Sequence, residues 1–280
     1  MNILIKGAGD LASGIACRLH ACGFSVVMTD LPVPTAVRRT VSFSRCIYEG
    51  TATVEGTAAV RCETLQQMET ALQGGNVAVF ADPQANIRTL WHPDVVVDAI
   101  LAKHNLGTHL EDAPVVIGVG PGFTAGQDCH CVVETKRGHY LGRCIYQGSA
   151  IPNTGVPGDI GGYTVERILR APCDGVFVPV VEIGAVVEAG QTCGLVNGVP
   201  MTSQIPGVVR GLLQEGVPVT EGMKSGDVDP RCAPEHCLTV SDKARAVGGG
   251  VLEAILHLTT KAQTEKRPGP NKPGEGAHHR

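Results

Sequence analysis

The chain opens with a short apolar run that leads through glycines into a helical pattern. Residues 2–7, "NILIKG", read as a strand, and Leu11, Ile15 and Leu19 recur at the spacing of one helix face. A second apolar run, "SVVMTD" at 25–30, predicts the next strand. We therefore expect a strand–helix–strand unit at the start of the chain.

Further runs of valine and isoleucine predict buried strands at 76–82, 94–100 and 113–120. Such runs, separated by helices, are typical of a parallel sheet that is covered on both faces. Residues 51–62 predict a hairpin, 63–74 a helix, and 129–146 a second hairpin at the edge of the sheet. The pattern indicates an α/β fold class, with a Rossmann-like parallel-sheet domain over residues 1–165.

The pattern changes to short strands and frequent turns from residue 171 onward. Residues 171–197 match 203–229 without gaps, at an offset of 32, and four glycines coincide. Coincident glycines predict coincident turns, so residues 166–232 should form a small all-β barrel-sandwich with an internal repeat. The repeat resembles biotinyl/lipoyl domains, but no lysine lies between Arg143 and Lys224 to carry either group. We expect neither biotin nor lipoate as a cofactor.

The last apolar pattern predicts a C-terminal helix within residues 233–258 that packs on the core. Three consecutive glycines, Gly248–Gly250, lie inside it, and each costs about 1 kcal/mol relative to alanine. This cost indicates that a backbone or a ligand lies against them. Residues 259–280 are polar and should form a disordered tail.

Composition narrows the classes of partner. The net charge of the 280 residues is −4, with no long run of one sign, which argues against nucleic acid. No apolar stretch approaches the roughly 20 residues of a membrane span, and the first residues do not read as a signal peptide. The 11 cysteines lack C-x-x-C spacing and read as reduced thiols. We expect a cytoplasmic protein; its oligomeric state, a homo-oligomer included, stays open.

The glycines after the first strand fit the G-x-G-x-x-G/A fingerprint of dinucleotide sites, at Gly7, Gly9 and Ala12. Asp30 ends the second strand, where such sites place the acid that binds ribose. The alternative is a strand-to-helix turn that binds no dinucleotide. Arg38 and Arg39 would suit a 2′-phosphate, which Asp30 would repel.

Two more glycine clusters could help to hold phosphate. Residues 118–126 include Gly120 and Gly122, and residues 153–162 include Asn153, Gly155 and Gly158. Exposed amides at such turns form anion-binding nests. The alternatives are a plain Pro-Gly turn and an interdomain linker. One phosphate-bearing ligand in a common pocket would explain all three clusters.

The sequence "DCHC" places Cys129 and Cys131 two residues apart. On a strand they would share one face, roughly 7 Å apart, and could hold a soft species such as selenium or sulfur. One pair does not make a closed zinc site, so no resident metal is expected. Cys232, His236 and Cys237 could assist, and buried inert thiols are the alternative. No Ser-His-Asp or paired-carboxylate pattern is present, so whether the chain is an enzyme stays open.

Several long strings carry a family resemblance: "GAGDLASGIA", "GVGPGFTAGQDCHCVVETKRGH", "PNTGVPGDIGGYTVER" and "SDKARAVGGGVLEAIL". With them the chain resembles the YqeB-type accessory proteins of selenium-dependent molybdenum hydroxylases. Its N-terminal fold is similar to XdhC-type chaperones for the molybdenum cofactor. The resemblance implies a role in maturing a hydroxylase of the xanthine dehydrogenase type, which would be the protein partner. It makes Cys129 and Cys131 candidates for handling the sulfur or selenium ligand of molybdenum.

The leading functional expectation is therefore an accessory factor that binds a nucleotide, the molybdenum cofactor or a selenium intermediate at the glycine-rich loops. An NAD(P)-dependent oxidoreductase is one alternative. A non-catalytic scaffold that docks the apo-hydroxylase is another. The expected cofactor is accordingly NAD(P) or a molybdopterin cofactor.

Overall fold

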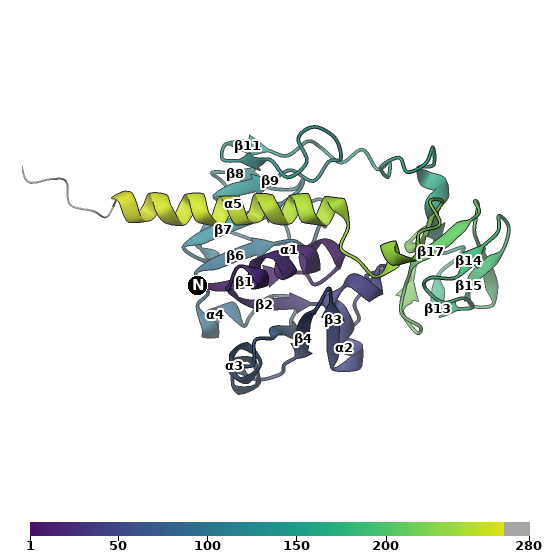
Figure 1. The fold of residues 1–280 in the computed structure, drawn as a ribbon, viewed down its shortest axis with the longest axis horizontal. Coiled ribbons are helices and arrows are strands. Elements are labelled where there is room, and N and C mark those ends of the chain that lie inside the picture. Colours follow the sequence, from purple (N-terminus) through teal and green to yellow (C-terminus); the bar gives the residue numbers. More distant parts are fainter. Residues whose placement is uncertain (266–280) are drawn as a thin grey trace, which may run out of the picture.

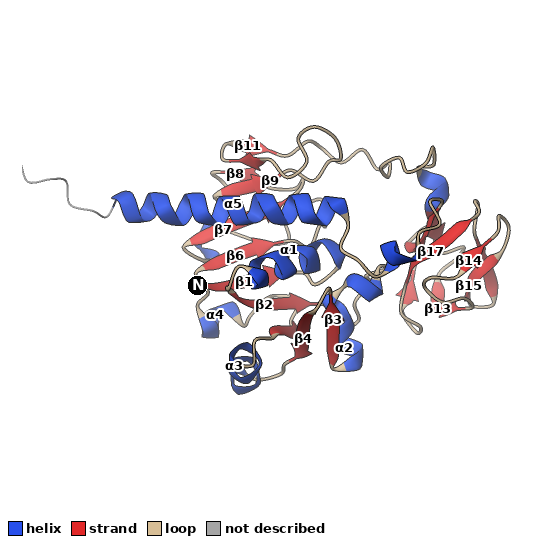
Figure 2. Cartoon of the chain, viewed as in Figure 1, coloured by secondary structure: helices blue, strands red, loops and turns tan. Residues whose placement is uncertain are grey.

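A large α/β module and a smaller β module make up the computed structural model, which describes residues 1–265 (Figure 1). The segments 150–167 and 230–241 join the two modules, and helix α5 (Asp242–Glu265) returns along the α/β module (Figure 2). In this part of the chain, no helix is long and apolar enough to span a bilayer.

The sheet of the α/β module is mixed. Its strands, in spatial order, are β10 (Cys144–Ile145), β9 (Cys131–Val133), β7 (Val115–Val119), β6 (Val95–Asp98), β1 (Asn2–Lys6), β2 (Ser25–Asp30), β5 (Val77–Ala81), β4 (Thr57–Arg61) and β3 (Thr51–Val54). Neighbours from β9 to β4 run parallel, whereas β10 and β3 pair antiparallel at the two edges. Beside it lies a small pair, β8 (Thr124–Ala125) and β11 (Gly148–Ser149).

Helices and loops cover both faces of this sheet. Side chains alternate along each strand, so Ile3 and Ile5 join one apolar cluster and Leu4 joins the other. Helices α1 (Asp10–Ala21), α2 (Cys46–Glu49) and α5 pack on the first cluster. On the other face lie α3 (Leu65–Gln73), α4 (Arg88–Trp91) and the loops that follow β7. Short 3₁₀ turns complete the module at Arg39–Val41, Phe43–Arg45 and Leu110–Asp112.

Helices α1 and α5 approach closely because small residues line their contact. A Cβ atom on Gly14 would lie 2.7 Å from Cβ of Ala244. Further along α5, a Cβ atom on Gly250 would lie 2.1 Å from the carbonyl oxygen of Gly142. The expectation that another backbone lies against the triple glycine is confirmed, and the partner is the turn before β10.

Two four-stranded sheets form the β module. One contains β12 (Ile168–Arg170), β19 (Lys224–Asp229), β17 (Gly207–Leu212) and β14 (Val186–Val187). The other contains β16 (Val199–Thr202), β15 (Thr192–Val196), β13 (Gly175–Pro179) and β18 (Pro218–Val219). Strands of the two halves of the repeat pair with each other. From the first half, β14 pairs with β17 of the second half, and β13 pairs with β18 of the second half. The 3₁₀ turns Val165–Arg167 and Pro234–Cys237 flank this module.

The expected fold class, a Rossmann-like parallel-sheet domain followed by a biotinyl/lipoyl-like barrel-sandwich and a C-terminal helix, is wrong. The sheet is mixed, and its later crossovers lack the expected helices: α4, of four residues, joins β5 to β6, and only a 3₁₀ turn joins β6 to β7. Helix α5, from the far end of the chain, contacts β7, β9 and β10 in their place. The β module consists of two separate sheets. A valine-rich run indicates that a strand is buried, but it does not indicate which helix or loop covers that strand.

The end of the last helix also differs from expectation. α5 continues to Glu265, beyond the expected end at residue 258. The rest of the expected disordered tail, 266–280, lies outside the described residues.

Candidate anion-binding site

A cavity of about 340 Å³ opens where β1, β2 and β6 end; we call it the glycine hollow. From β1 the chain proceeds to β2, then to β3 and β4 at the edge and back to β5, and it then crosses to β6 on the other side of β1. Open α/β sheets bind ligands at such a reversal, beside the carboxyl ends of the strands. Its lining includes the four residues expected from the fingerprint: Gly7, Gly9, Ala12 and Asp30.

Two glycines shape this hollow for different reasons. Gly7 has φ of +95°, and a Cβ atom there would lie 2.9 Å from the carbonyl oxygen of Ala99, so only glycine fits the turn. Gly9 precedes the first residue of α1 and has no neighbour within 4 Å of its Cβ position. The space beside Gly9 is therefore open to a ligand.

Asp30 holds the turn together. Its Oδ2 accepts a hydrogen bond from the amide of Ala8 at 2.8 Å, and its Oδ1 accepts one from the amide of Leu31 at 2.7 Å. Burial raises the pKa of Asp30. Among residues 1–260, the charged side chains that line the glycine hollow are both acidic, Asp10 and Asp30. Phosphate would be repelled here, which runs against the expected role of this turn.

A second cavity, of about 570 Å³, lies between the two modules; we call it the basic hollow. It shares Asp10 and Leu11 with the glycine hollow, so the two cavities adjoin at the N-terminus of α1. Within the described part of the chain, its lining contains nine cationic side chains: Arg38, Lys103, Lys136, Arg137, Arg167, Arg170, Arg210, Lys224 and Lys243. The carboxylates in the same lining are Asp10 and Asp227.

Both modules supply these cations. Lys136 and Arg137 follow β9 and Lys243 lies in the first turn of α5, whereas Arg210 and Lys224 come from the β module. The hollow is therefore built by docking one module on the other.

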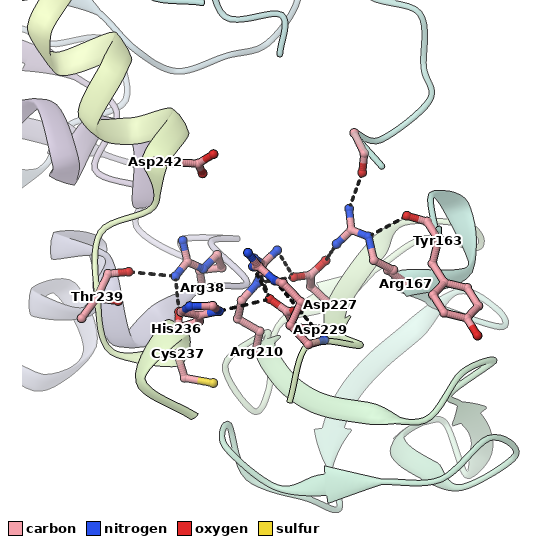
Figure 3. A network of polar contacts seen from close by, with 12 residues as sticks. Arg38, Tyr163, Arg167, Arg210, Asp227, Asp229, His236, Cys237, Thr239 and Asp242 are labelled. Atoms are coloured by element: carbon pink, nitrogen blue, oxygen red, sulfur yellow. Dashed lines mark hydrogen bonds and ion pairs between the residues drawn. The ribbon is translucent and has the colours of Figure 1, made fainter. Parts of the chain in front are cut away.

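The carboxylates at this wall are already paired with arginines (Figure 3). Asp227 accepts hydrogen bonds from Arg167 at 3.0 Å and from Arg210 at 2.7 Å. Arg210 also reaches Asp229 at 3.2 Å. Burial raises the pKa of Asp229, but hydrogen bonds from Arg231 and the charge of Arg210 outweigh it and lower the value to about 2. These carboxylates orient the arginines and leave other cations without a counterion.

Arg38 and Arg39 do not form the expected 2′-phosphate site. Arg38, 7% exposed, donates to the carbonyl oxygens of His236 and Thr239 (Figure 3). Its Nη1 lies 3.5 Å from Oδ2 of Asp10. Arg39 donates to the carbonyl oxygen of Leu212 at 2.8 Å. Both side chains connect the modules to each other, although Arg38 also lines the basic hollow.

The lysines of the hollow carry its free positive charge. Across residues 1–260, no carboxylate lies within ion-pair distance of Lys103, Lys136, Lys224 or Lys243. Burial, and then the charge of Arg137, lower the pKa of Lys243. An anion bound here would relieve this repulsion.

The third glycine cluster lies in the basic hollow. Its lining includes Asn153, Gly155 and Gly158, together with much of the joining segment 151–160. The first cluster reaches the same cavity through Asp10 and Leu11. Parts of both turns therefore face one ligand-sized space.

The second cluster contributes less than expected. The lining contains Pro121 but neither Gly120 nor Gly122. Gly122, with φ of +115°, packs against the backbone of His104, where a Cβ atom would lie 2.7 Å from the amide nitrogen. A Cβ atom on Gly120 would lie 2.7 Å from Oγ1 of Thr135. Gly120 and Gly122 are therefore required by the conformation and packing of the turn, and they do not line the basic hollow.

Cys129 and Cys131 are fully buried and do not share a face. Cys131 begins β9 and packs in the cluster below α1 and α5, whereas Cys129 precedes the strand and packs in the opposite cluster. Burial raises the pKa of Cys129 to about 11, and a hydrogen bond to Cys144 together with burial raises that of Cys131. Neither thiol has the character of a nucleophile.

Three other residues were expected to assist the two thiols: Cys232, His236 and Cys237. All three lie in the segment that joins the modules. Cys237 is buried, and its Sγ lies 3.7 Å from the carbonyl oxygen of Val209, to which it donates. Over the residues with described side chains, no group of three or more His, Cys, Asp or Glu is placed to hold a metal ion.

Comparisons with known proteins add one relative of undefined role. No family model matches the chain. The uncharacterized protein YqeB of Escherichia coli (strain K12) is 46% identical over 256 residues, which are 91% of this chain and 47% of that protein. The chain thus spans about half the length of the curated relative it matches.

Solved structures show only a weak likeness. An aspartoacylase family protein from Mesorhizobium loti is 14% identical with a TM-score of 0.25, covering 81% of this chain and 84% of that one. A succinylglutamate desuccinylase/aspartoacylase from Rhodobacter sphaeroides is 10% identical with a TM-score of 0.27, covering 80% and 86%. These scores assign neither a fold nor an activity to this chain.

The identification of the chain with a family of accessory proteins for selenium-dependent molybdenum hydroxylases, with an XdhC-like N-terminal domain, is therefore wrong. The maturation role that was expected with it stays a prediction. The relative that matches most of the chain is described only as uncharacterized.

Proposed function

We propose that the chain binds a phosphorylated small molecule, with its phosphates in the basic hollow between the two modules. The observation that carries the proposal is the gathering of nine cationic side chains around one cavity of the described chain. The lining contains two carboxylates, and Asp229 and Asp242 pair with Arg210 and Arg137 from outside it, so the cations remain in excess. The 280 residues together have a net charge of −4, so this concentration of positive charge is local.

The lysines without a counterion give the cavity its preference for phosphate. Lys136 lies in the loop after β9, Lys224 begins β19 and Lys243 lies in α5, so the three can contact a phosphate group from several sides. Hydrogen bonds to charged groups contribute about 1.5–3 kcal/mol each. Amides of the glycine-rich segment 153–158 can add neutral donors.

The ligands expected from the sequence, NAD(P) and a molybdopterin cofactor, both carry phosphate and both agree with this proposal. The roles expected with them stay predictions: an accessory factor, an oxidoreductase or a scaffold, with a hydroxylase as the partner. The buried pair Cys129 and Cys131 does not favour a thiol-based step.

The test is calorimetric titration of the full chain with ATP and with inorganic triphosphate. We expect saturable binding of both that weakens with added salt, because exposed charges are screened. Replacing Lys136 and Lys224 together by alanine should weaken both ligands by about tenfold or more, since 1.4 kcal/mol is a factor of ten.

A matched control separates a local effect from the change in net charge. Arg143→Ala together with Arg61→Ala removes two cations that line neither hollow. Equal weakening by the control pair and by the lysine pair would contradict the proposal, as would the absence of triphosphate binding at low salt.

A further inference from the structure

The glycine hollow differs in chemical character from the basic hollow that it adjoins. Resting on the proposed function, we propose that one ligand occupies both: its phosphates lie in the basic hollow and an uncharged, ring-bearing part lies in the glycine hollow. The ligand class is then a nucleoside polyphosphate or a dinucleotide, with a nucleoside end beside Gly9.

Continuity between the two cavities permits a single ligand. Asp10 and Leu11 line both, at the N-terminus of α1. The two volumes, about 340 and 570 Å³, each fall in the range of small-molecule pockets.

Charge determines which end of the ligand lies where. In the described chain the glycine hollow has no cationic lining residue, and it contains the carboxylates Asp10 and Asp30. The amide of Ala8, which a phosphate could otherwise use, donates to Asp30. Phosphate is therefore disfavoured at this turn and favoured beyond Asp10, where the lysines lie.

The walls of the glycine hollow suit an uncharged ring. Leu31 and Leu106 line it and are 44% and 51% exposed, so their apolar side chains are accessible to a ligand. Ile100 and Leu101 continue the same apolar surface. A ring between these side chains would cover them.

Polar groups at the same place can bind sugar hydroxyls. The carboxylate of Asp30 has lone pairs left after accepting one amide on each oxygen. Thr35 also lines the hollow and carries a hydroxyl group. This combination of apolar walls with a few hydroxyl-binding groups is that of a nucleoside site.

The experiment compares ATP with inorganic triphosphate on the wild type and on the double variant Leu31→Ala/Leu106→Ala. We expect the wild type to bind ATP about tenfold more tightly than triphosphate. The double variant should lose this advantage and bind triphosphate unchanged. Both leucines are exposed, so equal melting temperatures will show that the fold is intact.

Leu90→Ala is the matched control, because Leu90 is 64% exposed and lines neither hollow. Equal affinity of the wild type for the two ligands, or equal weakening of both by the double variant, overturns this inference and leaves the proposed function standing. Failure of triphosphate to bind overturns both.

Discussion

At the scale of single residues, Asp229 shows how the wall of the basic hollow depends on buried charge. It is 1% exposed and is hydrogen-bonded to Arg210 and Arg231. Because its pKa is lowered from 3.8 to about 2, it stabilises the fold fully above about pH 4, and this contribution is lost as the pH falls towards 2. Asp229→Asn should cost about 3 kcal/mol at pH 7, the usual cost of breaking a buried ion pair.

Urea unfolding at pH 7 and at pH 2.5 checks this prediction. The difference between the wild type and Asp229→Asn should shrink at the lower pH, where the wild-type carboxyl is itself becoming protonated. Asp159→Asn, at an exposed aspartate, should change stability little at either pH. A difference for Asp229→Asn that does not depend on pH would show that its charge does not contribute to stability.

The glycines of the site could be predicted from the sequence, whereas its cationic residues could not. Gly7 and Gly9 stand in a local motif, so their turn can be predicted from neighbouring residues. Lys103, Lys136 and Lys224 are far apart in the chain and meet only when the modules dock. The adjacent pairs Arg38–Arg39 and Lys136–Arg137, of which all but Arg39 line the basic hollow, were the local signals of positive charge.

At the scale of elements, the triple glycine of α5 gives a test with an internal control. A Cβ atom on Gly250 would meet the backbone of Gly142 at 2.1 Å, whereas one on Gly249 would meet nothing within 4 Å. Gly250→Ala should therefore destabilise the protein by about 1–3 kcal/mol, through overpacking. Gly249→Ala should stabilise it by up to about 1 kcal/mol, because alanine favours the helix.

Chemical unfolding of the two variants measures both effects. Destabilisation of similar size by both substitutions would contradict the observed contact between α5 and the turn before β10. Periodicity did predict a helix here, and the cost of three glycines predicted a close neighbour. It could not predict that α5 covers β7, β9 and β10, because that contact joins the end of the chain to its middle.

At the scale of the whole molecule, the site exists only where the two modules meet. The strand runs and the repeat could be read from the sequence because each is a local pattern. The mixed sheet, the two separate β sheets and the cavity between the modules depend on long-range contacts that no local pattern records. The expected fold class was wrong for this reason, whereas the expected phosphate-bearing ligand remains a proposal.

Hydrogen–deuterium exchange of the full chain, with and without saturating ATP, tests most directly whether one phosphorylated ligand bridges the two modules. Simultaneous protection is expected in three segments that line the basic hollow: residues 135–137, 152–158 and 224–227. Protection confined to one module, or unchanged exchange at ATP concentrations that saturate the calorimetric signal, would contradict the account.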